Sequence, residues 1–143
     1  MINNVVETWH GIISGANPEA LNDLLADDVV FYSPVVFTPQ HGKPVTAMYL
    51  LAAFATLAGP DSGFHYVKEV LAGNQAVLEF ESTVDGKYIN GVDIVTCDDA
   101  GKIIEFKVMI RAATGHQRDP REDARRTRSG TRLIFTPQRT TNQ

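Results

Sequence analysis

The second half of the chain alternates apolar and polar residues, which is the pattern of β-strands with one buried face. The alternating runs cover residues 64–71, 75–84, 87–97 and 102–111. Turn residues separate them, including an Asp-Gly pair at 85–86, and Asp-Gly between two alternating runs is a strong signal for a β-hairpin. The pattern therefore predicts four consecutive antiparallel strands.

The first half is patterned mainly for helices. Apolar residues at helical spacing predict helices over residues 3–14, from Pro18 to about residue 26, and over 44–57, with a short strand from Val29 to Tyr32 and a loop from Val35 to His41. The residues expected to face inward are Val5, Val6, Trp9, Ile12 and Ile13 in the first helix, Ala20, Leu21, Leu24 and Leu25 in the second, and Val45, Met48, Tyr49, Ala52 and Ala53 in the third. This order predicts an α+β fold in which three N-terminal helices pack on one face of a curved, mostly antiparallel sheet.

A single acid, Asp93, interrupts the apolar alternation of the last two strands. The segment GVDIVTCDDAGKIIEFKVMI (91–110) sets Ile104, Phe106, Val108 and Ile110 on one face of its second strand. If Asp93 shares that face it lies in a pocket, where loss of hydration raises the pKa of a carboxyl group. The alternative is a solvent-exposed carboxylate at the sheet edge or paired with Lys107, and the sequence leaves both open.

Composition indicates one soluble domain of ordinary core size. The chain has 143 residues, 43% of them hydrophobic and 21% charged, with a net charge of −4. A single cysteine, Cys97, excludes an internal disulfide. The N-terminus lacks the pattern of a signal peptide and no apolar run approaches the length of a membrane span, so a cytoplasmic location without a membrane partner is expected.

The charges divide the chain near Ala112. Residues 1–112 hold six basic and 14 acidic residues, a net −8, whereas the rest holds seven arginines and three acids, a net +4. The segment 113–143 is rich in Arg, Thr, Gly, Pro and Gln, which predicts a poorly ordered tail. Its arginines are interleaved with acids and have one aromatic neighbour, Phe135, so nucleic-acid binding is not favoured.

Several features together resemble the SnoaL-like proteins of the nuclear transport factor 2-like superfamily. They are a first helix with a central Trp9, the segment LLADDVVFYSP (24–34), a glycine before the third helix, and the 91–110 hairpin. The resemblance covers about residues 3–112 and implies a cone-shaped α+β barrel with a deep apolar pocket, commonly a homodimer through the outer sheet face. The superfamily includes ketosteroid isomerases, polyketide cyclases, limonene epoxide hydrolase and dehydratases.

The tail departs from the resemblance. Family members continue beyond the position of Arg111 with a proline and a short helical segment, whereas Ala112-Ala113-Thr114-Gly115 begins an unrelated pattern. We interpret the tail as a frameshifted or degenerate end, which the other reading frames of the coding DNA would test.

The isomerase pattern can be carried onto three positions of this chain. Its proton-shuttling Asp falls on Ser33, its oxyanion-binding Tyr falls on Trp9, and its second, neutral Asp donor falls on Asp93. A serine hydroxyl cannot remove an acidic C–H proton near neutral pH without a base of its own. The resemblance therefore argues for the pocket and against steroid isomerisation.

Asp93 is the predicted catalytic acid or base. The predicted substrate-binding residues are Trp9, Tyr32, Ser33, Tyr49, Phe106 and Val108. Acid–base chemistry needs a second polar group, for which the candidates are Ser33, Tyr32, Tyr49 and His65 in that order, and Tyr66 could also supply a hydroxyl to a cavity.

The histidines and short motifs give no further site. His10 is rotated about 100° from Trp9 round its helix and is expected to face away. His65 should lie on the strand face opposite Phe64 and Tyr66. No metal-ligand spacing, nucleotide loop or GxSxG motif is present, so we expect no metal and no cofactor.

Two functions follow. The first is a pocket protein for a small hydrophobic molecule, either an isomerase, cyclase, dehydratase or hydrolase that uses Asp93. The second is a non-catalytic module that binds a ligand or only dimerises. Fold alone does not choose between them.

Overall fold

The computed structural model describes residues 1–113. The predicted tail therefore lies outside the described residues, except for Ala113, whose N–H donates to the carbonyl of Tyr88 at 3.0 Å.

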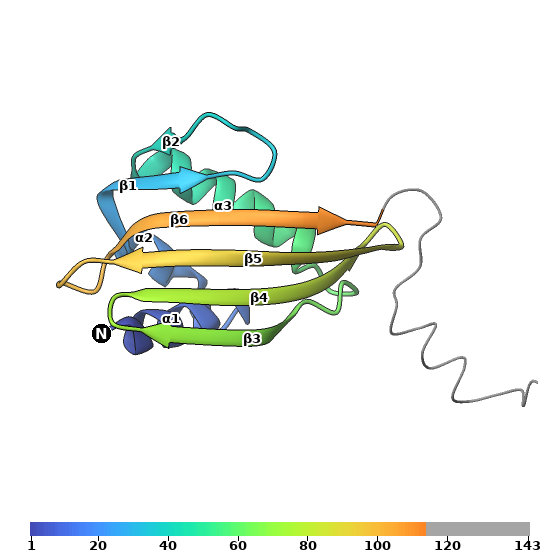
Figure 1. Cartoon of the computed structure of the whole chain (residues 1–143), viewed down its shortest axis with the longest axis horizontal. Coiled ribbons are helices and arrows are strands. Elements are labelled where there is room, and N and C mark those ends of the chain that lie inside the picture. The colour runs from blue at the N-terminus through green and yellow to red at the C-terminus, as the bar shows by residue number, and fades with distance from the viewer. Residues whose placement is uncertain (114–143) are drawn as a thin grey trace, which may run out of the picture.

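The architecture is the predicted α+β fold. The elements in chain order are α1 (Ile2–Ile13), the 3-10 turn η1 (Pro18–Ala20), α2 (Leu21–Leu24), β1 (Leu25–Tyr32), β2 (Gln40–His41), α3 (Lys43–Leu57), β3 (His65–Ala72), β4 (Gln75–Val84), β5 (Lys87–Cys97) and β6 (Ile103–Ala112). The strands form one sheet in the order β2-β1-β6-β5-β4-β3, with the helices on one face (Figure 1). All neighbouring strands are antiparallel except β1 and β6. The sheet is not closed, because β2 and β3 are its edges.

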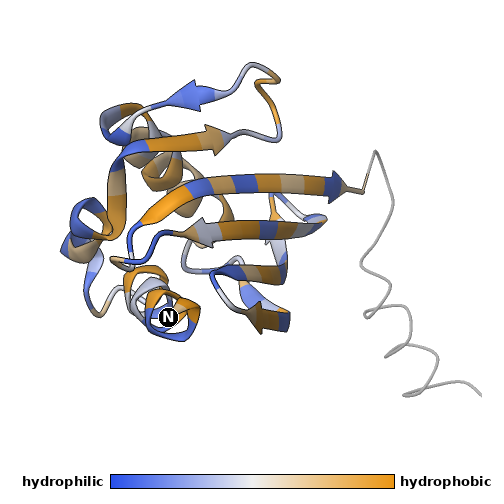
Figure 2. Cartoon of the chain, turned by 60° about the vertical axis from the view of Figure 1, so that its left-hand side comes forward, coloured by the Kyte–Doolittle hydropathy of each residue, from blue (hydrophilic) through white to orange (hydrophobic). Residues whose placement is uncertain are grey.

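The core lies between the helices and the inner face of the sheet. As predicted, α1 buries Val5, Val6, Trp9 and Ile12. Burial alternates along β4 and β5, and the alternation of hydropathy along the strands is visible in Figure 2. The period-2 pattern thus specifies which side of each central strand faces the helices.

The region from residue 18 to 41 differs from the prediction. The second helix is shorter than expected, because Leu25 is already extended and pairs with Ile103 of β6. The loop before α3 contains the short strand β2, whose His41 pairs with Val30. Pairing with strands distant in the sequence overrides the local helical pattern here.

Two predicted faces differ in part from the structure. On β6, Ile103 rather than Ile104 is fully buried, because Cys97 pairs with Ile103 and the register shifts at that point. On α3, the buried residues are Thr46 and Leu50, whereas Met48 is 59% exposed. This helix is apolar on nearly all sides, so its sequence did not define a single inward face.

Within residues 1–113, no helix is long and apolar enough to cross a membrane.

Candidate active site

Asp93 lies on the inner face of the sheet, at the centre of β5. It pairs with Leu78 of β4 and Val108 of β6, and only 5% of its surface is exposed. The structure therefore places Asp93 on the same face as Phe106 and Val108, which is one of the two alternatives that the sequence left open. Lys107 faces the other way, with its ammonium 4.7 Å from the centre of the Tyr32 ring. The alternative of an exposed carboxylate paired with Lys107 is excluded.

Three side chains from three elements form a hydrogen-bonded chain at this point. Trp9 Nε1 of α1 donates to Tyr66 Oη at 2.8 Å, and Tyr66 Oη of β3 donates to Asp93 Oδ2 at 2.7 Å. A phenolic hydroxyl can accept one hydrogen bond while donating another, so Tyr66 links the indole to the carboxyl group. The chain gives every buried polar atom of Trp9 and Tyr66 a partner.

A glycine makes room for this arrangement. Gly91 faces the core next to Phe80, and a Cβ at Gly91 would lie 2.3 Å from Phe80 Cζ. The tip of the Phe80 ring can therefore lie against Gly91, and the ring centre lies 5.1 Å from that of Phe64. Tyr66 pairs with Phe80 across the strands and reaches diagonally to Asp93.

Burial controls the protonation of both acidic groups. Loss of hydration raises the pKa of Asp93 from 3.8 to about 7, while the hydrogen bond from Tyr66 acts in the opposite direction. Burial, and then the nearby Asp93, raise the pKa of the Tyr66 hydroxyl well above its ordinary value. Asp93 is therefore divided between its neutral and ionised forms near neutral pH, and Tyr66 stays protonated.

The cavity beside Asp93 is small and almost wholly apolar. Its volume is about 30 Å³, and its lining includes Trp9, Phe54, Phe64, Phe106 and Val108. That is room for about one or two water molecules, whereas pockets for small ligands are roughly 300–1,000 Å³. The deep pocket implied by the family resemblance is thus reduced to a narrow space in this conformation.

A larger cleft of about 340 Å³ adjoins this cavity. It lies between the end of α1 and the turn from α3 to β3, and its lining includes His10, Pro60 and Tyr66. Ala58 and Phe64 border both spaces. The cleft and the Asp93 cavity are therefore neighbours separated by few side chains.

The structure brings some of the predicted site residues together and leaves others apart. Trp9, Phe106 and Val108 join Asp93 around the cavity. Tyr49 instead stacks on Phe31, with ring centres 5.6 Å apart. The Tyr32 ring lies beneath Lys107, away from the cavity.

Ser33 likewise lies away from Asp93, because its Oγ accepts the N–H groups of Val35 and Val36 in the turn after β1. The binding roles assigned to Tyr32, Ser33 and Tyr49 gain no support from this geometry.

Sequence reasoning missed Tyr66 as the partner of Asp93 and ranked His65 above it. His65 Nδ1 lies 2.8 Å from the carbonyl of Gly63, and its ring is directed to the opposite side of β3. The alternation that set His65 opposite Tyr66 was the available signal for the inward position of Tyr66.

His10 does not line the Asp93 cavity, as expected, but its ring lies beside Tyr66. Its Nε2 lies 2.5 Å from Glu69 Oε1, and its ring centre lies 5.8 Å from that of Tyr66. A rotation of 100° from Trp9 brings His10 to the edge strand β3 rather than to open solvent. Among residues 1–113, no cluster of three or more His, Cys, Asp or Glu could hold a metal ion.

Comparison with known proteins places this geometry in a family. No curated protein sequence matches the chain. A steroid delta-isomerase structure from Pseudomonas aeruginosa is 32% identical, with a TM-score of 0.72 over 89% of this chain and 91% of that one. A Silicibacter pomeroyi protein with a cystatin-like fold is 25% identical, with a TM-score of 0.67 over 75% and 73%.

The fold is also shared with SalBIII, an epoxide hydrolase/cyclase-like enzyme with a role in pyran ring formation in the polyether salinomycin. It is 13% identical, with a TM-score of 0.61 over 76% of this chain and 89% of that one. The model of the SnoaL-like domain matches residues 6–106, which include Trp9, Tyr66 and Asp93. With the family model matching most of the chain and the α+β fold shared with these structures, the chain belongs to the SnoaL-like domain family.

Proposed function

We propose that this protein binds a small, largely apolar carbonyl compound beside Asp93 and acts on it by acid–base chemistry that needs no cofactor. The observation that carries the proposal is the hydrogen-bonded chain from Trp9 through Tyr66 to Asp93, which ends in an apolar cavity. Polar groups converging on an apolar space are the usual form of a small-molecule site.

The chemistry follows from the protonation of Asp93. In its neutral form, with Tyr66 donating to Oδ2, the carboxyl group can donate its own proton to the oxygen of a bound carbonyl group. Hydrogen-bond donors fixed in a dry site stabilise negative charge that develops on such an oxygen. Asp93 would thus serve as the acid of an enolisation, an isomerisation or a ring closure.

The comparisons support the substrate class more than the reaction. The 32% identical structure carries the name of a steroid isomerase, which favours an apolar ring compound. The carboxylate base of the isomerase pattern, however, is replaced by Ser33, which is hydrogen-bonded within its own turn. We therefore propose a carbonyl substrate without assigning steroid isomerisation.

The small size of the cavity favours a second candidate function, that of a non-catalytic module. A space of about 30 Å³ holds no organic substrate in this conformation. In a non-catalytic module, the Trp9–Tyr66–Asp93 chain would be a polar network within the core that stabilises one packing arrangement. The two candidates differ in whether ligands reach Asp93.

Ligand titration at two pH values separates them. Trp9 is the single tryptophan, so its fluorescence reports binding at the cavity. We would titrate androst-4-ene-3,17-dione and cyclohex-2-enone below and above pH 7. Because ionised Asp93 cannot donate to a carbonyl oxygen, the affinity should weaken as the pH rises through about 7.

The variant Asp93→Asn should remove this pH dependence. Asp99→Asn, in the exposed turn before β6, is the matched control and should retain it. A lack of saturable fluorescence change with every ketone at both pH values would favour the non-catalytic module. If the affinity of Asp93→Asn for the ketones depended on pH as in the wild type, Asp93 would not be part of the binding site.

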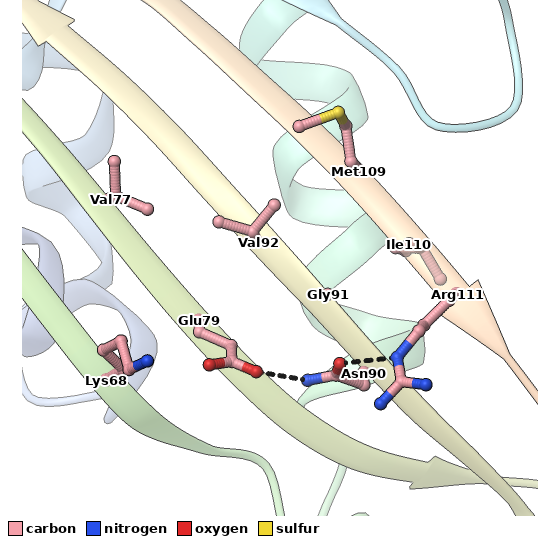
Figure 3. A pocket seen from close by; sticks show the side chains of 9 residues that line it. All are labelled: Lys68, Val77, Glu79, Asn90, Gly91, Val92, Met109, Ile110 and Arg111. Carbon is pink, nitrogen blue, oxygen red and sulfur yellow. Dashed lines mark hydrogen bonds between the residues drawn. The ribbon is translucent and has the colours of Figure 1, made fainter.

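We also propose that the outer face of the sheet pairs with a second copy of the chain. A shallow hollow of about 430 Å³ lies there, and its lining includes Val77, Val92 and Met109. Figure 3 shows these side chains beside a polar row in which Asn90 donates to Glu79 at 3.0 Å and accepts from Arg111 at 2.9 Å. Because Val77 and Met109 are 38% and 49% exposed, burying them favours association.

A further inference from the structure

A histidine lines the cleft next to the Asp93 cavity and has a carboxylate partner. His10 Nε2 lies 2.5 Å from Glu69 Oε1, and the two side chains are 44% and 32% exposed. Glu69 comes from β3, in the same cross-strand row as Leu78 and Asp93. The two side chains therefore lie at the rim of the site, where His10 of α1 contacts Glu69 on the edge strand that also carries Tyr66.

The carboxylate defines which nitrogen of His10 can act as a base. Glu69 next to Nε2 favours the form of the imidazole that carries its proton on Nε2. The other nitrogen, Nδ1, is then left with a free lone pair. Among the hydrogen bonds formed within residues 1–113, none involves Nδ1 of His10. Carboxylate–imidazole pairs of this kind orient general bases in enzymes.

We propose that His10, oriented by Glu69, is the proton acceptor that works opposite Asp93 and Tyr66, with the substrate lying across the cleft and the cavity. The inference rests on the proposed function, because it supplies the second group that acid–base chemistry on a carbonyl compound needs. It also supplies a base in a chain that has Ser33 in place of the carboxylate of the isomerase pattern.

The proposed proton transfer needs no co-reactant. His10 Nδ1 takes a proton from the carbon next to the substrate carbonyl, or from the carbon beyond a C=C bond conjugated with it. The electron pair of the broken C–H bond forms a new C=C bond. The carbonyl becomes an enolate, whose oxygen is held by a hydrogen bond from neutral Asp93, and Asp93 itself accepts a hydrogen bond from Tyr66. The imidazolium then returns a proton to the same or another carbon, which restores the carbonyl and the neutral imidazole.

The path between the two groups passes Phe64. This side chain borders both the cleft and the cavity, and its ring lies 5.3 Å from that of Tyr66 and 5.1 Å from that of Phe80. The turn before it is anchored, because Thr83 N–H donates to the carbonyl of Ser62 at 2.8 Å. A change in the Phe64 side chain, with the turn in place, is therefore the simplest way to join the cleft to the cavity.

Proton exchange measures the step directly. With cyclohex-2-enone in D₂O, the wild-type protein should exchange the acidic C–H hydrogens of the ketone for deuterium. These hydrogens are on the CH₂ groups next to the carbonyl and next to the C=C bond, and ¹H NMR follows their loss. His10→Gln should slow this exchange by about 100-fold or more, the usual contribution of a general base. Its affinity for the ketone, from Trp9 fluorescence, should stay within about twofold of wild type, because the hydrogen bond that holds the carbonyl comes from Asp93.

Two further variants complete the test. Glu69→Gln should slow exchange less than His10→Gln, again with unchanged affinity, since Glu69 acts through the imidazole. His41→Gln, an exposed histidine on β2, is the matched control and should exchange at the wild-type rate.

These experiments test the ketone-binding function and the role of His10 separately. Absence of ketone binding by the wild-type protein overturns the proposed function. Binding without exchange, or exchange that persists in His10→Gln, overturns the role of His10 and leaves the binding site intact.

Discussion

The hydroxyl of Tyr66 donates a 2.7 Å hydrogen bond to Oδ2 of Asp93, which lies 27 residues further along the chain. This contact joins the edge strand β3 to the central strand β5, and it links α1 to both because Trp9 donates to the same hydroxyl. The contact places a titratable carboxyl group at the end of a chain of donors inside an apolar core.

The pH dependence of stability should report the buried carboxyl group. The pKa of Asp93 is raised from 3.8 to about 7 on folding, so the unfolded chain ionises first as the pH rises. The contribution of Asp93 to the free energy of unfolding should therefore fall between about pH 4 and pH 7 and level off above, by up to about 4 kcal/mol.

Urea unfolding at several pH values tests this expectation. The fall should be absent in Asp93→Asn and present in Asp99→Asn. Parallel pH profiles for the wild type and Asp93→Asn would show that Asp93 ionises as readily in the folded chain as in the unfolded one.

Removing the Tyr66 hydroxyl should raise the pKa of Asp93 further. Tyr66→Phe deletes the hydrogen bond that lowers this pKa against the larger effect of burial, and it leaves Trp9 Nε1 without its acceptor. We expect a loss of about 1–3 kcal/mol in stability.

A titration of the ¹³C-labelled carboxyl group of Asp93 by NMR measures the shift in pKa. Tyr88→Phe, near the β4–β5 turn, is the control and should leave the midpoint unchanged. A lower midpoint in Tyr66→Phe would contradict the role of the hydrogen bond.

A methyl group at Gly91 should disturb the core. In Gly91→Ala the new Cβ would lie 2.3 Å from Phe80 Cζ, so the ring must move. We expect destabilisation of about 1–3 kcal/mol in urea unfolding. The same substitution at Gly11 meets nothing closer than 4.0 Å within helix α1 and should stabilise by up to about 1 kcal/mol. Equal effects at the two glycines would exclude the steric explanation.

Shortening Phe64 should open the cavity to the cleft. Phe64→Ala removes a ring that borders both spaces, so ketones bulkier than cyclohex-2-enone should bind faster and more tightly. Stopped-flow fluorescence of Trp9 measures the association rate. Phe37→Ala is the control, because that side chain is 99% exposed in the β1–β2 loop. An unchanged rate in Phe64→Ala would show that ligands reach Asp93 by another path.

A charge on the outer sheet face should weaken the proposed homodimer. Met109→Asp places a carboxylate among Val77 and Val92, where a second copy would bury it without a partner. Sedimentation velocity should show a dimer for the wild type and a monomer for this variant. Met48→Asp is the matched control, because Met48 is 59% exposed on α3 and lies away from that face. A wild-type monomer at all concentrations would overturn the dimer.

The sequence by itself determined the parts of this protein that depend on local periodicity. The alternation in residues 75–97 specified which side of β4 and β5 faces the core, and it left open whether Asp93 is buried or exposed. The spacing of Val5, Val6, Trp9 and Ile12 likewise specified the buried face of α1. These features follow from the fixed geometry of strands and helices.

Only the tertiary structure decided which side chains contact Asp93. Its partner Tyr66 depends on the register of β3 against β4, and the position of His10 depends on how α1 packs over that edge strand. The inward face of α3 was equally undetermined, because its sequence is apolar on nearly all sides. Register and packing are set by contacts between residues far apart in the chain, which no local pattern encodes. For the same reason, the sequence did not predict that the cavity beside Asp93 has a volume of only about 30 Å³ and adjoins a larger cleft.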